Sequence, residues 1–435
     1  MATDDPQRYE PELALALNDL SVRHGALGNW RQGRAASERA VTVYRRLAAA
    51  QPDAYSAELA NSLNSLSIDC QESGLCTEAV TAGEEALTIY RRLAEGDPDI
   101  HEPDVAKSLN SLSIAYDTDG SLECAVAASI EAVGVFRGLS AQDPETYEPD
   151  LARCLNALSA SAAEYGDCDR AVNASIEAVD LYRSLAEKEP DTHQPDLAAS
   201  LNTLSVAYET LSVADEDSGE RIGEALEASG EAIDLYRKLV AANPKAHTGN
   251  LALSLGQLAR VHEDQGDLTA ARAAGVETVA LFRQLSGADD DGESALAAAE
   301  ESVLIFRRLD EAAPGAYAAD VVESLQTAAG AHSMVGCHSS AVDLAEESVT
   351  VFRRLAEEDA DTYGPELAFA LNYLATRYAE AERWDEAYAP IKESVELFHG
   401  IAEAVPGAHP ERMAEALTNM ADIAGKTGRD PRRGD

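Results

Sequence analysis

Apolar residues recur along this chain with the spacing of helices that bury one face. In residues 98–139, a first apolar face is formed by Val105, Leu109, Leu112 and Tyr116, which lie three or four residues apart. A second apolar face follows, formed by Ala125, Ala128, Ala132, Val133 and Phe136. The pattern predicts two amphipathic helices, and the alanines of the second helix allow close helix crossing.

A glycine separates the two predicted helices. Gly120 can adopt the left-handed backbone conformation that ends a helix, because it has no Cβ to clash. The equivalent position carries glycine in most of the chain, at Gly28, Gly74, Gly166, Gly266, Gly336 and Gly428. We expect these glycines to form the turn between a first and a second helix.

The helix–glycine–helix pattern recurs with a period of 46 residues. Leu109 recurs as Leu17, Leu63, Leu155, Leu201, Leu255, Leu325, Leu371 and Leu417. Phe136 recurs as Tyr44, Tyr90, Tyr182, Tyr236, Phe282, Phe306, Phe352 and Phe398. Such a period is typical of a solenoid, in which each repeat buries its apolar face against its neighbours. The sequence predicts an all-α, right-handed α-solenoid of helix-turn-helix repeats.

Two irregularities interrupt the array. Eight additional residues near 211–221 indicate a longer loop or an extra helical turn within the fifth repeat. Residues 288–293 are acidic and contain glycine, a composition typical of a linker. We predict six repeats over residues 1–287, a linker at 288–293, and an unpaired helix, two further repeats and a C-terminal capping helix over residues 294–435.

The stretch after this linker lacks a first helix. Residues 294–309 follow the pattern of a second helix, and only 24 residues separate Phe282 from Phe306. This helix either occupies the place of the missing first helix or marks a hinge, and we favour a continuous stack with a local kink. The last copy, residues 410–428, is a lone first helix of the kind that caps solenoids.

The recurring residues resemble those of the tetratricopeptide repeat, a helix-turn-helix unit of about 34 residues. The resemblance extends over nearly the whole chain and rests on Leu109, Leu112, Ser113, Tyr116, Gly120, Ala125, Ala132 and their counterparts. The longer period is similar to that of kinesin light chains and of actinobacterial proteins built from such repeats. The resemblance implies a scaffold without enzymatic activity that binds proteins or peptides on a concave face lined by the first helices.

Two columns of the first helices are the binding residues that this resemblance implies. They are Asn18, Asn64, Asn110, Asn156, Asn202 and Asn372, and, four residues after each asparagine, Val22, Ile68, Ile114 and Val206. An extended peptide would find amide groups for its backbone and an apolar surface for its side chains. Alternatively, each asparagine bonds a neighbouring helix and stiffens the stack. Both interpretations fit the even spacing.

The chain is strongly acidic, and this excludes some partners. With 34 Lys and Arg against 78 Asp and Glu, its formal net charge is −44. Such a field repels phosphate backbones and attracts basic proteins, so we expect no nucleic-acid ligand. No stretch has the apolar length of a membrane span, and the N-terminus does not resemble a signal peptide. A cytoplasmic protein that does not contact membranes is expected.

No residues have the spacing of a catalytic, metal or cofactor site. The six cysteines form no CxxC pair. Gly425, Lys426 and Thr427 resemble the end of a phosphate-binding loop, but Met420 stands where that motif needs glycine. Recurring glutamates, such as Glu85, occur once per repeat, too far apart for paired acid–base catalysis. We expect no enzyme and no cofactor.

An arginine column near the ends of the second helices has a structural explanation. Its members are Arg45, Arg91, Arg137, Arg183, Arg237, Arg283, Arg307 and Arg353. We expect these arginines to offset the helix dipole and to pair with acidic residues of neighbouring loops.

The sequence favours a scaffold that binds a protein or peptide. Two other functions remain open: a regulatory sensor arm that acts on a separate effector enzyme, and an acidic decoy that occupies a basic protein by charge alone. Groove binding would persist in moderate salt and would depend on Asn64, Asn110 and Asn156. Decoy binding would weaken as salt rises.

Overall fold

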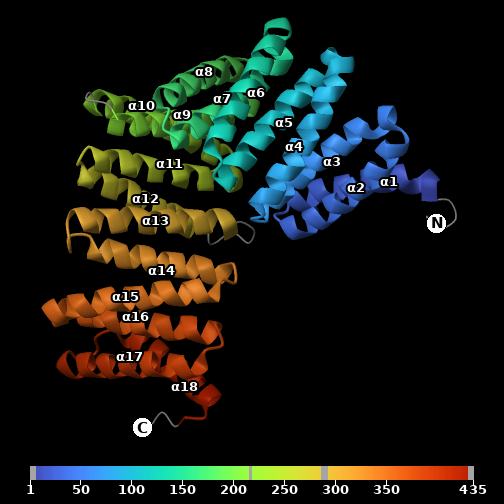
Figure 1. Cartoon of the computed structure of the whole chain (residues 1–435). Helices are drawn as coiled ribbons and strands as arrows, with labels where there is room; N and C mark the ends of the chain where they lie inside the picture. The colour runs from blue at the N-terminus through green and yellow to red at the C-terminus, as the bar shows by residue number, and fades with distance from the viewer. Residues whose placement is uncertain (1–5, 215–217, 286–291, 430–435) are drawn as a thin grey trace. The chain divides into compact units, whose positions relative to one another are not determined.

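The computed structural model describes residues 6–214, 218–285 and 292–429, which form helices and no strands (Figure 1). The first nine helices are α1 (Pro6–Gly25), α2 (Trp30–Ala50), α3 (Pro52–Glu72), α4 (Cys76–Gly96), α5 (Pro98–Asp119), α6 (Leu122–Gln142), α7 (Pro144–Tyr165), α8 (Cys168–Lys188) and α9 (Pro190–Ala214). The others are α10 (Ser218–Ala242), α11 (Pro244–Asp264), α12 (Leu268–Leu285), α13 (Gly292–Ala312), α14 (Ala318–Met334), α15 (His338–Glu358), α16 (Ala360–Glu380), α17 (Trp384–Ala404) and α18 (Pro410–Thr427).

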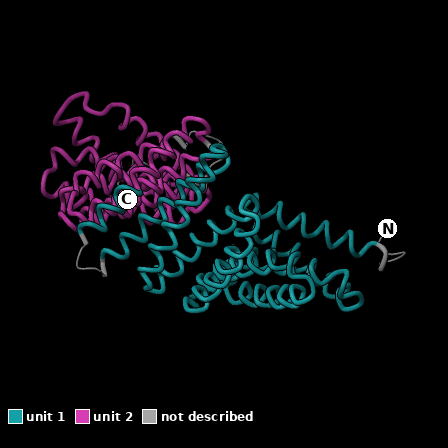
Figure 2. The backbone as a smooth tube through the Cα atoms, turned by 90° about the horizontal axis from the view of Figure 1, so that it is seen from above, with its two compact units in different colours: residues 1–228 teal, residues 229–435 magenta. Residues whose placement is uncertain are grey.

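The chain divides into two compact units, residues 1–228 (unit 1) and 229–435 (unit 2) (Figure 2). In unit 1 each helix from α1 to α9 packs on the next, and consecutive first helices (α1, α3, α5, α7 and α9) also contact each other. This arrangement confirms the all-α solenoid. The boundary falls within α10, whereas most of the predicted linker at 288–293 lies outside the described residues, so that division stays a prediction.

The turns between paired helices form as predicted. Gly120 has a φ of 80° and ends α5 in the left-handed conformation. The other predicted turn glycines also have positive φ: Gly28, Gly74, Gly166, Gly266, Gly336 and Gly428. Before α17, Glu382 takes the place of glycine with a φ of 59°. That conformation costs a residue with a Cβ about 1–2 kcal/mol.

The additional residues of the fifth repeat lengthen its helices. α9 and α10 have 25 residues each, whereas α3 to α8 have 21 or 22. Of the two expected outcomes, an extra helical turn is therefore the one observed. Residues 215–217, between these helices, lie outside the described part of the chain.

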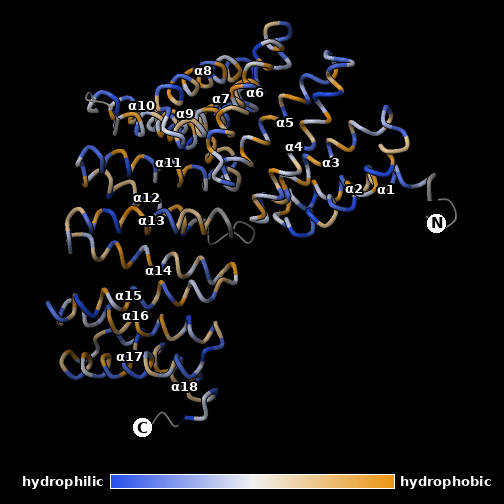
Figure 3. The backbone as a smooth tube through the Cα atoms, in the orientation of Figure 1, coloured by the Kyte–Doolittle hydropathy of each residue, from blue (hydrophilic) through white to orange (hydrophobic). Residues whose placement is uncertain are grey.

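Apolar faces from successive helices form the core of each unit. In unit 1, Leu63, Leu109 and Leu155 of the recurring leucine column are at most 1% exposed. In unit 2, Leu371 and Phe398 are buried in the same way. Apolar and polar residues alternate along each helix, as expected where one face is buried (Figure 3).

Within unit 2, α13 takes the place of the missing first helix. It contacts α11 as well as α12, and α14 in turn contacts α12 as well as α13. Two glycines allow this close packing. A Cβ on Gly256 of α11 would lie 2.4 Å from Cγ of Glu301 on α13, and one on Gly275 of α12 would lie 3.0 Å from the ring of Phe306. Within unit 2 the described helices therefore continue as one stack.

Because one helix is missing, first and second helices exchange layers in unit 2. The first helix α11 contacts α13, whereas the later first helices α14, α16 and α18 follow α12. Polar contacts join these later helices: Tyr373 of α16 donates to the carbonyl of Gln326 on α14 (2.8 Å), and Arg412 of α18 pairs with Glu366 of α16 (3.0 Å). The first helices up to α11 therefore carry odd numbers, whereas the later first helices of unit 2 carry even numbers.

The last described helix, α18, packs on the end of unit 2. α18 buries Ala416, Met420, Ile423 and Ala424. Cations near or within α18 also lie over aromatic rings of α16 and α17. These pairs are Arg412 over Phe369 (4.8 Å to the ring centroid), Lys426 over Trp384 (5.4 Å) and Arg429 over Tyr388 (4.7 Å).

One expectation about membranes is corrected. α6 is long and apolar enough to cross a membrane by length and composition, and it is the one such helix in the described residues. Its many small apolar residues, interrupted by Glu131 and Arg137, raise its hydropathy without forming an unbroken apolar run. In the structure α6 packs against α5 and α7 like the other second helices. A core helix passes the same test, so the finding is weak evidence for a membrane span.

We predict that Gly256→Ala destabilises the protein by about 1–3 kcal/mol, because the added methyl group collides with Glu301. Urea unfolding would measure the change, and Glu301→Ala in the same chain should recover most of it. Gly400→Ala in α17 is the matched control, since its Cβ would meet no atom within 4 Å. It should stabilise by about 0.5–1 kcal/mol. A loss in Gly256→Ala that Glu301→Ala leaves unchanged would contradict the close packing of α11 and α13.

Candidate binding surface

The predicted asparagine column lies between consecutive first helices of unit 1. Three asparagines each bond a serine on the next first helix, 44 residues later. The donor–acceptor pairs are Asn18–Ser62 (2.8 Å), Ser108–Asn64 (3.0 Å) and Asn156–Ser200 (2.6 Å). These bonds join α1 to α3, α3 to α5 and α7 to α9, as the stack-stiffening interpretation expects.

The same column retains unused hydrogen-bonding capacity. The side-chain oxygens of Asn18, Asn110 and Asn156 are buried and accept no hydrogen bond from the described residues. A buried acceptor without a donor costs about 1–3 kcal/mol. Because these oxygens are buried, the N–H of a bound peptide would reach them only after the asparagine side chain changes its rotamer.

Asn110 differs from its neighbours because its serine partner is replaced. The residue 44 positions later is Cys154, which is buried. Asn110 and Cys154 line a cavity of about 190 Å³, together with Lys107, Ser111, Phe136, Asp150 and Arg153. Burial raises the pKa of the Cys154 thiol to about 12, so the thiol stays protonated and is a poor nucleophile.

The second predicted column lies at the surface. Val22, Ile68, Ile114 and Val206 on α1, α3, α5 and α9 are 63, 45, 40 and 39% exposed. Each follows an asparagine by four residues, one helical turn along the same helix. Unit 1 therefore presents a row of apolar side chains beside the asparagines.

Asn372 does not share this environment. It belongs to unit 2 and is 2% exposed. Its Nδ2 donates to Glu415 Oε1 (3.2 Å), and its Oδ1 accepts from Asn419 Nδ2 (2.9 Å). Since both ends of this amide are bonded within unit 2, we leave Asn372 out of the candidate surface. Asn202, on α9, is partly exposed and stays within it.

Ion pairs connect the second helices, and here the expected partners are wrong. Seven of the eight arginines pair with a glutamate 40 residues later on another helix, and Arg183 pairs with Asp180 of its own helix, so none of these partners is a loop residue. In unit 1 the pairs are Arg45–Glu85, Arg91–Glu131 and Arg137–Glu177. Both columns are visible in the sequence, and their constant offset is the signal that could have revealed the pairing. Exposed pairs of this kind contribute about 0–1 kcal/mol each.

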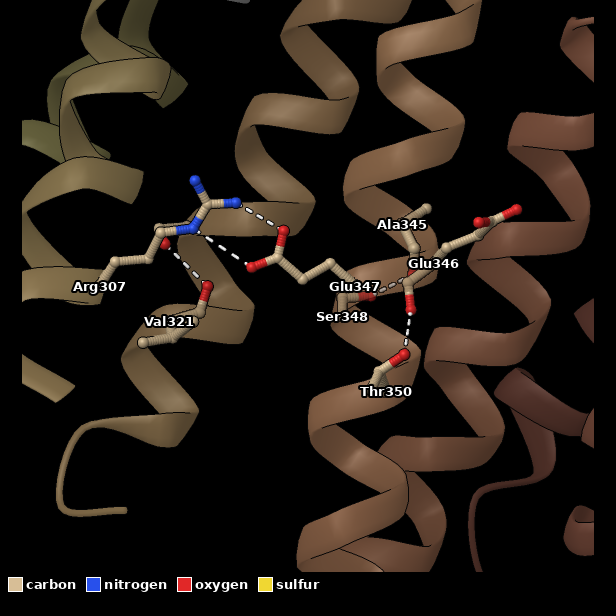
Figure 4. A network of polar contacts seen from close by, with 8 residues as sticks. Arg307, Val321, Ala345, Glu346, Glu347, Ser348 and Thr350 are labelled. Carbon is tan, nitrogen blue, oxygen red and sulfur yellow. Dashed lines mark hydrogen bonds and ion pairs between the residues drawn. The ribbon is translucent and has the colours of Figure 1, made fainter. Parts of the chain in front are cut away.

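In unit 2 the same series of arginine–glutamate pairs follows the exchange of layers. It joins α10, α12 and α14 through Arg237–Glu277 and Arg283–Glu323. It also joins α13, α15 and α17 through Arg307–Glu347 and Arg353–Glu393. Figure 4 shows the Arg307 guanidinium on α13 directed at the Glu347 carboxylate on α15.

The described residues form no cluster of three or more His, Cys, Asp or Glu that could hold a metal ion. Gly425, Lys426 and Thr427 lie within α18, and the Lys426 ammonium sits over the Trp384 ring. This part of the chain therefore lacks the geometry of a phosphate-binding loop. The chemistry that the site offers is hydrogen bonding and apolar contact.

We predict that Cys154→Ser couples to Asn110, because a hydroxyl at this position restores the hydrogen bond made by the other serines of the column. A double-mutant cycle with Asn110→Ala, measured by urea unfolding, should give a coupling free energy of about 1 kcal/mol. Cys70→Ser is a control at a buried cysteine outside the column and should show no coupling to Asn110→Ala. Zero coupling between positions 110 and 154 would contradict the view that each asparagine bonds the residue 44 positions later.

The family model of the tetratricopeptide repeat matches residues 59–99 and 251–292. These matches cover α4, most of α3, and most of α11 together with α12. No curated protein matches the sequence.

Several solved structures align with the chain. BtubC (BKLC) from P. vanneervenii aligns at 21% identity, with 59% of this chain and 92% of that chain covered and a TM-score of 0.46. A putative kinesin light chain from Podosopora anserina aligns at 20% identity, covering 54% and 98%, with a TM-score of 0.42. The human IFIT1 dimer with m7Gppp-AAAA aligns at 11% identity, covering 88% and 76%, with a TM-score of 0.44.

The likeness to this family rests on the matched segments and on the recurrence of their residues along the chain. The matched helices share their leucine, alanine and turn-glycine columns with the other repeats. The chain thus contains two segments that match the tetratricopeptide repeat model, within an array of similar repeats.

Proposed function

We propose that this protein is a scaffold without enzymatic activity, which binds an extended peptide segment of a partner protein on the first helices of unit 1. The observation that carries the proposal is the exposed row Val22, Ile68, Ile114 and Val206 beside the asparagine column. β-Branched side chains held at the surface of four separate helices supply apolar contact area, and the asparagines beside them offer amide groups to the peptide backbone.

The spacing of the first helices sets the form of the ligand. Helices in contact lie about 8–10 Å apart. A polyproline II segment advances about 9 Å in three residues, so every third side chain returns to the same face. We expect a ligand with an apolar side chain at every third position.

The acidic charge of the chain favours one further property of the partner. A net charge of −44 raises the local concentration of cationic segments, so basic residues on the outer face of the ligand would speed association. The decoy function, in which charge alone binds a basic protein, is the second candidate supported by this observation. The sensor arm rests on family resemblance alone.

Selection of peptides from a random 12-residue library, followed by titration of the best binder, tests the proposal. Ile68→Asp and Ile114→Asp together should weaken binding by about 10–100-fold, because each carboxylate replaces apolar contact area. Ile176→Asp is the matched control: Ile176 is 37% exposed on α8, a second helix of the same unit, and its substitution should change affinity less than threefold.

Salt separates the two candidate functions. Groove binding should change by less than about tenfold between 50 and 300 mM salt, whereas binding by charge alone falls much further. A ligand that ignores both isoleucine substitutions and dissociates at high salt would reject the groove and support the decoy.

A further inference from the structure

The first helix of unit 1 exposes an apolar stripe on the side that continues the solenoid. Tyr9, Leu13, Ala16 and Leu20 lie three or four residues apart on α1, and Leu27 follows in the turn after it. The exposed fractions of Tyr9, Leu13, Leu20 and Leu27 are 41, 41, 43 and 74%. One contiguous face of α1 therefore lacks the cover that apolar faces receive elsewhere in the unit.

The same positions are covered in the interior repeats. Leu59, Val105 and Leu151 are the counterparts of Leu13, and all three are buried. The second helix of each preceding repeat packs on them, as α2 does on α3 and α4 on α5. α1 has no such helix in the described residues.

Polar positions show that another repeat of the same kind does not fit on α1. Ala16 stands where the interior repeats have the serine that bonds the preceding asparagine. On α2, Arg39 stands where Glu85 and its counterparts accept the preceding arginine. A preceding repeat would lose its asparagine bond and would oppose arginine to arginine.

We infer that a second copy of this chain covers the stripe, with the two α1 helices packed antiparallel about a two-fold axis. In such a pair the stripe is self-complementary: Tyr9 faces Leu27 of the second copy, and Ala16 faces Leu20. The small side chain of Ala16 near the centre lets the helices approach closely. An interface of this kind is isologous and closes, so it produces dimers and not fibres.

Charge on the flank of the stripe agrees with this arrangement. Glu12 and Arg23 lie on the same flank of α1, at similar distances on either side of its centre. Both have no partner among the described residues. An antiparallel two-fold pair brings Glu12 of each copy beside Arg23 of the other. A parallel two-fold pair places this flank of the two copies on opposite sides of the interface, so it would not form this bridge.

Sedimentation equilibrium of the full chain tests the inference. The wild-type chain should have twice the mass of one chain, and Leu20→Glu should raise the dimer dissociation constant at least about 100-fold. Leu15→Glu is the matched control, because Leu15 is 57% exposed on the same helix but lies outside the stripe. It should leave the dimer intact. Circular dichroism would establish that each variant keeps its helices.

A charge exchange tests the orientation of the two copies. Glu12→Arg and Arg23→Glu should each weaken the dimer by about tenfold, and the double variant should return to within about threefold of wild type. Failure of the double variant to recover would reject the antiparallel two-fold pair. A wild-type chain that stays single up to about 100 μM, or a dimer that Leu15→Glu breaks and Leu20→Glu does not, would overturn the inference.

Discussion

Each helix in this protein depends on burying its apolar face against the helices next to it in the chain. Within each unit, a helix contacts the helices next to it in the chain and those two positions away. The packing therefore consists of local contacts between helices and not of one common core. An array built this way tolerates the loss of a helix, because the next apolar face can still be buried. The loss of a helix changes which helices form each layer. α13 packs where a first helix belongs, and every later helix of unit 2 lies in the other layer. Gly256 and Gly275 supply the space for that junction.

The features that the sequence predicts well are those that depend on a short stretch of chain. The turn at Gly120 needs only a residue without a Cβ, and the apolar spacing around Leu109 needs only the geometry of one helix. Each of these features is decided within about twenty residues, where helix periodicity is strong evidence.

Features that depend on which faces meet could not be predicted in the same way. Asn64 and Ser108 recur with equal regularity, but their bond requires the register of α3 against α5. The exchange of layers is also invisible in the apolar pattern, since a helix of either type satisfies the same spacing. For the candidate site, the sequence alone left two roles open for the asparagines. In the structure, Nδ2 of Asn156 bonds the next first helix, while its side-chain oxygen accepts no hydrogen bond from the described residues.

The two ends of the array are built differently, and nearest-neighbour packing makes that difference important. A terminal repeat has one neighbour where an interior repeat has two, so it opens most readily. At the C-terminal end, α18 and the ring contacts of Arg412, Lys426 and Arg429 offset this loss. At the N-terminal end, the Leu13 and Leu20 side chains of α1 are exposed to water. Arg39 on α2 would repel the recurring arginine of a further repeat. A second copy there would give α1 the contacts that α2 gives α3, so association would stabilise the helix that carries Asn18 and Val22 at the edge of the candidate binding surface.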